Sequence, residues 1–157
     1  MRIRLFIICL MSLICINALK DSVKIESDSL KYFSDDNYSL FEGNVKAVYD
    51  DIIIYSKKMY VYMRENDEVD KIVCKGDVKI VKDDITSTAK EAEYDVDKDI
   101  FYLYGGVRIW QDNNYLEGEE IVYNNKTNEI QVKKGKNRRV IVIFKPEKKE
   151  DNTTNVP

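Results

Sequence analysis

The stretch Ile72-Val73-Cys74-Lys75-Gly76-Asp77-Val78-Lys79-Ile80 alternates apolar or small residues with mostly polar ones. Strict alternation over nine residues is typical of a β-strand with one buried face, whereas a helix would need apolar residues three and four positions apart. The glycine stands in the middle of the run, and a glycine inside a strand marks a bend or a close backbone approach. The stretch therefore predicts a long strand that folds over at Gly76.

The same pattern occurs on both sides of this stretch. Gly43-Asn44-Val45-Lys46-Ala47 and Gly105-Gly106-Val107-Arg108-Ile109 share with it the order glycine, any residue, valine, cation, apolar residue. The three glycines are 33 and 29 residues apart, and Gly135 follows 30 residues later. A repeat of this period indicates an array of similar structural units.

A second element lies between successive glycines. In each copy a small residue is followed at positions +3 and +5 by apolar or tyrosine side chains, and the small residues are Ser27, Ser56, Ala89 and Gly118. The apolar positions change parity within the element, so one face can stay buried only if the strand bends or bulges there.

Polar clusters separate the expected strands. One set of turns is expected at Asp50-Asp51, Asp83-Asp84 and Asn113-Asn114, and another at residues 35–37, 65–67, 97–99 and 124–128. Such clusters are typical of tight hairpin connections. The sequence thus predicts an all-β fold of repeated β-hairpins, which form a V-shaped, two-sheet jelly roll or solenoid with an apolar interior.

The first residues differ from the rest. Arg2 and Arg4 precede an apolar run from Leu5 to Ile16, and a small residue stands at a plausible cut after Ala18. This order predicts a cleaved signal peptide over residues 1–18 and export to the periplasm. An uncleaved membrane anchor is the alternative, although the run is shorter than the roughly 20 residues that span a bilayer. The expected domain covers residues 19–145, and a polar tail, expected to be disordered, covers residues 146–157.

Composition excludes several classes of protein. The chain of 157 residues has no histidine, which rules out Ser-His-Asp and Cys-His catalysis and zinc sites that need histidine. Its net charge of −3 argues against a mainly electrostatic grip on nucleic acid. Without the signal peptide Cys74 is the sole cysteine, so no internal disulfide is expected, and a buried hydrophobic role fits it best. We expect no catalytic residue, no metal site, no cofactor and no enzymatic activity.

Two features could serve contacts with partners. Val140 to Phe144 form an apolar run with side chains suited to both faces of a strand. It is either an ordinary last strand protected by the charged tail or a docking edge for another protein or another copy. Trp110 has the parity opposite to that of Ile109, so we expect it to be exposed at an edge, where it could contact a partner or lipid.

The repeated elements together carry a family resemblance. The stretches concerned are residues 23–32 (VKIESDSLKY), 41–45 (FEGNV), 75–80 (KGDVKI), 89–95 (AKEAEYD) and 116–124 (LEGEEIVYN). In this order the chain resembles, over roughly residues 23–144, the OstA/LptA family of periplasmic lipopolysaccharide-transport domains, which LptA, LptC and the N-terminal domain of LptD share. It is most similar to the LptA branch. It departs from the pattern at Ser87-Thr88, where more apolar residues are expected, and after Gly135, where no Gly-x-Val follows.

The resemblance implies a function in lipid transport. It implies an apolar groove that shields the acyl chains of lipid A between the inner and outer membranes, with lipopolysaccharide as the ligand. Exposure of each CH₂ group to water costs about 0.8 kcal/mol, so such a lipid needs a long apolar enclosure. The implied partners are an LptC-like protein at the inner membrane, an LptD-like protein at the outer membrane and, end to end, further copies of the chain.

The parity of the strands suggests which residues line this groove. Each of them is either a lipid contact or a core side chain that never touches lipid; they are Ile54, Met59, Ile72, Val78, Ile80, Phe101, Leu103, Val107, Ile109, Leu116, Ile121 and Tyr123. Two other functions remain open. If the N-terminus is retained, the chain is a membrane-tethered, LptC-like adaptor; if no lipid binds, it is a β-solenoid scaffold of the envelope.

Overall fold

The computed structural model describes residues 23–145, and all regular secondary structure within this range is β. The expected signal peptide lies outside the described residues, as does the expected tail. The strands are β1 (Lys24–Glu26), β2 (Ser29–Phe33), β3 (Tyr38–Tyr49), β4 (Ile52–Met63), β5 (Val69–Lys82), β6 (Ile85–Asp95), β7 (Ile100–Gln111), β8 (Asn114–Asn124), β9 (Glu129–Lys133) and β10 (Ile141–Ile143).

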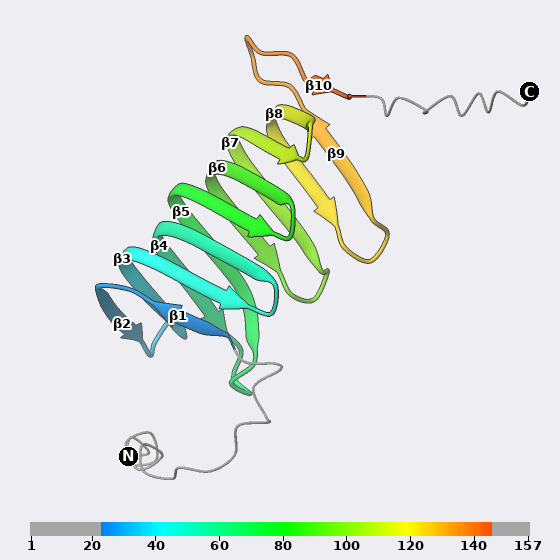
Figure 1. The fold of residues 1–157 in the computed structure, drawn as a ribbon. Coiled ribbons are helices and arrows are strands. Elements are labelled where there is room, and N and C mark those ends of the chain that lie inside the picture. The colour runs from blue at the N-terminus through cyan, green and yellow to red at the C-terminus, as the bar shows by residue number, and fades with distance from the viewer. Residues whose placement is uncertain (1–22, 146–157) are drawn as a thin grey trace, which may run out of the picture.

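The strands form one antiparallel sheet that is folded along its middle. Each strand from β3 to β8 pairs with the next along the chain. At one end β1 and β2 pair with the two halves of β3, and at the other end β10 and β9 pair with the two halves of β8. Figure 1 shows the result as two layers that meet where the long strands fold over. The expected V-shaped, two-layered array of hairpins is confirmed.

We call the halves that contain residues 45–56, 78–89 and 107–118 layer A, together with β1 and β10. The other halves form layer B, together with β2 and β9. The layers meet at a series of corners, which stack along the left-hand side of the array in Figure 1.

The corners lie at the glycines that the repeat pattern singled out. In β5 the register with β6 shifts between Lys75 and Val78, and Gly76 has a φ of 80°. Asp77 beside it also lies in the left-handed region, at 49°. A residue with a side chain rarely adopts a φ of 80° without strain, so the glycine at position 76 lets the strand bulge and bend. On β4 and β6 the corresponding shifts fall at Ser56 and Ala89, two of the small residues of the second element.

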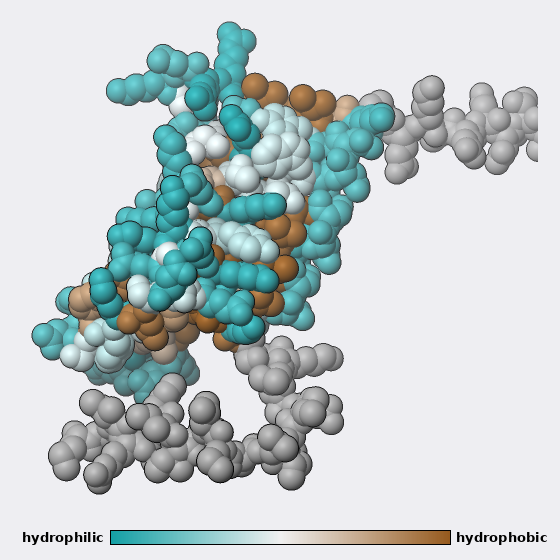
Figure 2. Space-filling model, turned by 60° about the vertical axis from the view of Figure 1, so that its left-hand side comes forward, coloured by the Kyte–Doolittle hydropathy of each residue, from teal (hydrophilic) through white to brown (hydrophobic). Residues whose placement is uncertain are grey.

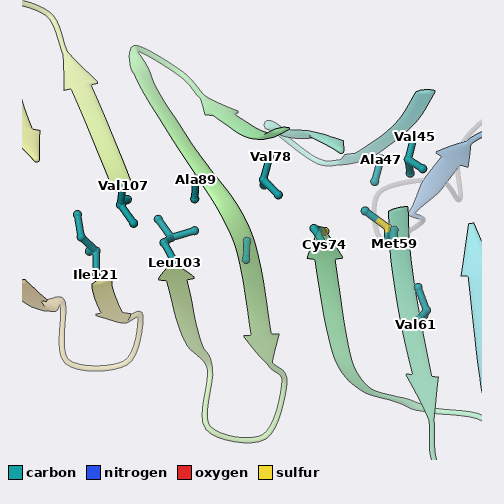
Figure 3. Packing of buried hydrophobic residues seen from close by; sticks show 11 residues of the cluster. Val45, Ala47, Met59, Val61, Cys74, Val78, Ala89, Leu103, Val107 and Ile121 are labelled. Atoms are coloured by element: carbon teal, nitrogen blue, oxygen red, sulfur yellow. The ribbon is translucent and has the colours of Figure 1, made fainter. Parts of the chain in front are cut away.

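The core is continuous along the array. One hydrophobic cluster combines buried residues of layer A, such as Val45, Val78 and Val107, with buried residues of layer B, such as Met59 and Leu103. Figure 3 shows these side chains following one another from strand to strand. The inward side chains of each strand pack against the inward side chains of the next strand. The whole array therefore has one core rather than separate small ones.

The structure differs from the sequence prediction in three details. The third turn of the first set falls at Asp112-Asn113, one residue earlier than expected, because Asp112 takes the left-handed conformation that Asp50 and Asp83 take in the other two. The last strand spans only Ile141–Ile143 of the apolar run. Trp110 is exposed as expected, but it lies on β7 between two neighbouring strands, packed on Tyr115, rather than at an edge.

Candidate functional site

The inner face of layer B presents two parallel rows of side chains across the strands. The row next to the corner runs through Leu30, Phe41, Met59, Cys74, Ala92, Leu103, Ile121 and Val132. The row farther out runs through Tyr32, Ser39, Val61, Ile72, Tyr94, Phe101, Tyr123 and Ile130. Ser39 is the only residue in the two rows whose side chain is not largely apolar.

The inner face of layer A is also mostly apolar. Its register places in one row Ile25, Ala47, Ile54, Ile80, Ser87, Ile109, Leu116 and Val142. Most of these residues pack against the cluster that includes layer B. The two layers therefore turn apolar faces toward one interior.

All twelve residues that the sequence suggested for the groove lie on these inner faces. Five of them are buried: Met59, Val78, Leu103, Val107 and Ile121. The other seven are half-buried: Ile54, Ile72, Ile80, Phe101, Ile109, Leu116 and Tyr123. Val107 has no exposed surface at all, so the buried five hold the layers together, while the half-buried seven keep apolar surface available in the interior.

The half-buried residues of layer B include an aromatic row. Phe101 stacks on Tyr94 with ring centroids 4.3 Å apart and lies 6.4 Å from the ring of Tyr123. The Tyr94 hydroxyl donates a hydrogen bond of 2.9 Å to Asp99. Burial and this hydrogen bond to a carboxylate raise the pKa of Tyr94 to about 12, so its ring remains neutral at any physiological pH.

Sequence reasoning missed several members of these rows. Tyr94, Val61 and Ala92 belong to the layer B rows but were not among the suggested lining residues. Tyr94 and Val61 stand at the +5 position of the second repeat element and Ala92 at +3. The positions were therefore identifiable by applying the repeat to every copy rather than to individual strands.

Few polar groups interrupt the interior. Ser56 and Ser87 are the buried polar residues of the described chain, and the Ser56 hydroxyl donates to the Lys58 carbonyl at 3.0 Å. Within residues 23–145 no buried side-chain N or O atom lacks a hydrogen-bond partner. The Cys74 thiol is also buried, which raises its pKa to about 12. The interior thus has no polar group that demands a polar ligand.

The outer face of layer B mixes charged with apolar side chains. Glu42 accepts ion pairs from Lys31 at 3.0 Å and from Lys58 at 2.8 Å, and these two ammonium groups hold the pKa of the Glu42 carboxyl below its ordinary value. Across the sheet the same row continues to Lys133, which lies 2.7 Å from Glu120. The same face also carries the buried side chains of Leu40 and Val73 and a cluster of four aromatic rings, Phe33, Tyr38, Tyr60 and Tyr62. The two inner rows of layer B, in contrast, contain no charged residue.

The two ends of the array are open strand edges. On the first edge Leu30 and Tyr32 of β2 are exposed. On the last edge Ile130 of β9 and the run from Val140 to Phe144 are exposed. Figure 2 shows hydrophobic surface gathered at this C-terminal end. No further strand of the described chain covers either edge.

Within residues 23–145 no helix is long and apolar enough to cross a membrane. The same residues contain no group of three acidic or cysteine side chains suited to hold a metal ion.

Comparison with known proteins agrees with this architecture. A solved structure of LptH from Pseudomonas aeruginosa, described as the LptA homologous periplasmic component of the lipopolysaccharide transport device, superposes with a TM-score of 0.71 at 13% sequence identity. The match covers 81% of this chain and 97% of that one. No curated protein matches the sequence. The family model of the LptA/(LptD N-terminal domain) LPS transport protein matches residues 24–129, which is most of the folded array. The chain therefore belongs to the LptA/LptD N-terminal domain family of lipopolysaccharide transport proteins.

Proposed function

We propose that the chain is a periplasmic carrier that binds lipopolysaccharide by enclosing the acyl chains of lipid A between layers A and B. The observation that carries this proposal is the pair of facing apolar inner faces. The row from Phe41 to Ile121 in layer B and the row from Ala47 to Leu116 in layer A contain no charged residue. The sugars of such a lipid would stay in water outside the layers.

The half-buried residues supply the binding energy in this proposal. Burial of apolar surface contributes about 25 cal/mol per Å², and each CH₂ group withdrawn from water contributes about 0.8 kcal/mol. An acyl chain has no hydrogen-bonding group, so an interior with satisfied polar groups costs nothing to occupy. Ile72, Ile80 and Phe101 are half-buried and point into this interior from both layers.

The open edges fit the same function. We infer that neighbouring units pair edge to edge, β1 with β10 in layer A and β2 with β9 in layer B. An LptC-like protein, further copies of this chain and an LptD-like protein then form one continuous array between the membranes. Unpaired backbone groups on an edge strand favour addition of another strand. The exposed apolar side chains at both ends would be covered in such an array.

Two neighbouring substitutions on β5 test the carrier. Ile80 lies on the inner face of layer A and Val81 lies on the outer face, and both are half-buried. We expect Ile80→Asp to lose at least about ten-fold in affinity for purified lipopolysaccharide, because a carboxylate in the apolar interior would face acyl chains. Val81→Asp places the same charge on the outside and should bind like the parent chain.

Circular dichroism and thermal melting would confirm that both variants are folded before binding is compared. If Ile80→Asp does not fold, Ile109→Ser with Trp110→Ser as its neighbour repeats the comparison on β7 with a milder change. Equal binding by a folded inner variant and its outer control would contradict the carrier.

A further inference from the structure

The three glycine corners have different second residues. The residue after the glycine is Asn44 in the first corner, Asp77 in the second and Gly106 in the third. All three occupy the left-handed region, with φ values of 46°, 49° and 68°. The backbone is thus the same in each corner, and only the third has no side chain there.

In the first two corners the side chain of the residue after the glycine has a partner from an earlier part of the chain. The Asn44 amide donates to Asp28 at 2.8 Å, and Lys57 lies 2.6 Å from the Asp77 carboxylate. Asp28 and Lys57 occupy equivalent places, since each covers the corner glycine so closely that a Cβ on Gly43 or Gly76 would collide with it. These corners satisfy their own polar side chains.

The third corner lacks this internal partner. Lys90 covers Gly105 just as Lys57 covers Gly76. Gly106 offers it no carboxylate, and no acidic group among residues 23–145 lies within ion-pair distance of Lys90. In the second corner Asp77 neutralises the ammonium group of Lys57. In the third corner the equivalent ammonium group, that of Lys90, has no counter-charge.

The missing side chain opens a depression of about 670 Å³ on the outside of the corner. Its charged lining residues are Lys90, Arg108, Lys136, Arg138 and one acid, Glu119. The Arg138 guanidinium comes within 3.4 Å of the point where a Cβ on Gly106 would stand. Lys136 and Arg138 have no ion pair within the described chain, and Arg108 has only a long one of 3.9 Å to Glu117. A protein of net charge −3 therefore concentrates four cations against one carboxylate here.

The depression is separate from the apolar interior. Arg108 is exposed and points outward, between Val107 and Ile109, which point inward. The corner side, which comes forward in Figure 2, carries mostly hydrophilic side chains. A ligand here would not occupy the space proposed for acyl chains.

We propose that this depression binds a phosphate group. Guanidinium groups present paired donors that match phosphate oxygens, and ammonium groups add point charges. The glycine backbone leaves room for close approach of a tetrahedral anion, whereas a side chain at position 106 would fill it. The phosphate belongs either to a small soluble anion or to a lipid head group presented from outside the array.

Restoring the missing side chain tests the site. Gly106→Asp would place a carboxylate beside Lys90, as Asp77 stands beside Lys57, and the backbone accepts it because Asp77 adopts a similar φ. We expect inorganic phosphate and pyrophosphate to shift the amide resonances of Gly105 and Gly106 saturably in the parent chain. Gly106→Asp should weaken this binding at least about ten-fold, and Arg138→Ala should weaken it in the same direction without filling the pocket.

The converse substitution is the matched control. Asp77→Gly removes the carboxylate from the second corner, but that corner has no segment equivalent to residues 135–138, so it should gain no pyrophosphate binding of its own. Vesicles that contain phosphatidic acid, compared with pure phosphatidylcholine vesicles, distinguish the two sources. Sedimentation of the parent chain but not of Gly106→Asp with the acidic vesicles would indicate a head group, and binding of free phosphate alone would indicate a soluble ligand.

The absence of any saturable shift in the parent chain, or equal pyrophosphate affinity in Gly106→Asp, would overturn the proposal. Binding of lipopolysaccharide between the layers is expected to be unaffected by Gly106→Asp. Failure of the phosphate site and failure of the carrier are therefore distinguishable.

Discussion

Two kinds of residue determine how this chain folds back on itself. At the corners, glycine and a left-handed neighbour let each long strand bulge, and small residues on the adjacent strands let the layers approach. Behind the corners, valines such as Val45, Val78 and Val107 are almost completely buried. A β-branched side chain packs well on a pleated surface, so these positions combine strand propensity with core packing.

Burial predicts which inward residues maintain the fold. Ile121 is 1% exposed, whereas Ile130 on the neighbouring strand is 53% exposed, although both point inward. We expect Ile121→Ala to lower the free energy of unfolding by about 2–5 kcal/mol, the usual range for a buried isoleucine. Ile130→Ala should change it by less than about 1 kcal/mol. Urea unfolding of the two variants measures the difference, and similar losses would show that β9 is packed as tightly as β8.

Alkaline pH tests the burial of Cys74. Its pKa in the fold is raised to about 12 from an ordinary value of 9.0, chiefly because burial disfavours the thiolate. A raised pKa of an acid means that the fold holds the protonated form. The contribution to stability is therefore complete below pH 9 and is lost progressively as the pH rises toward 12. Cys74→Ala should show a smaller loss of stability than the parent chain between about pH 8 and about pH 11, the range in which the thiol begins to titrate, when the two proteins are compared in denaturant titrations. An identical pH profile in the two proteins would contradict a buried, protonated thiol.

At the scale of the element, the array differs from a closed barrel in having two edges. Every strand from β3 to β8 has neighbours on both sides, and the ends are half-length strands with exposed apolar residues. The repeat itself produces this arrangement, because each unit buries its faces only on the adjacent units. The ends are consequently the parts suited to add another unit.

Complementary edge variants test end-to-end pairing. Leu30 lies on the first edge and Ile130 on the last, and both are exposed. A lysine at either position puts a charge on an edge strand, which opposes strand addition. We expect Leu30→Lys alone and Ile130→Lys alone to be monomeric in analytical ultracentrifugation at concentrations where the parent chain associates. An equimolar mixture should form dimers and nothing larger, since each variant keeps one intact edge. Association of the single variants to the parent level, or a mixture that stays monomeric, would contradict this pairing.

At the scale of the whole molecule, the repeat made most of the fold predictable. The Gly-x-Val pattern located the corners, and alternation located the inner faces, because both follow from local backbone chemistry. The turn at Asp112-Asn113 was misplaced by one residue, since several adjacent polar residues suit a hairpin equally well and the register of the flanking strands decides among them. The depression beside Gly106 was not predicted at all, because it depends on Arg138 and Lys136 returning from a distant segment to a corner that lacks one side chain.

The degree to which each inward residue is buried could likewise not be predicted from the sequence. Parity placed Val107 and Phe101 on the same inner surface, but only the packing of both layers makes Val107 inaccessible and leaves Phe101 half-buried. In the proposed carrier, the half-buried inward residues are the ones that would contact the ligand.

Site-specific photo-crosslinking from adjacent residues of β7 tests the carrier most directly. Phe101 points into the interior and Tyr102 points outward, and both are half-buried. With a photoreactive phenylalanine analogue at each position in turn, we predict that irradiation of the folded protein with purified lipopolysaccharide yields a lipid adduct at position 101 and little or none at position 102. Equal adducts at both positions, or no adduct at position 101 in a protein that melts like the parent chain, would contradict an interior that holds acyl chains.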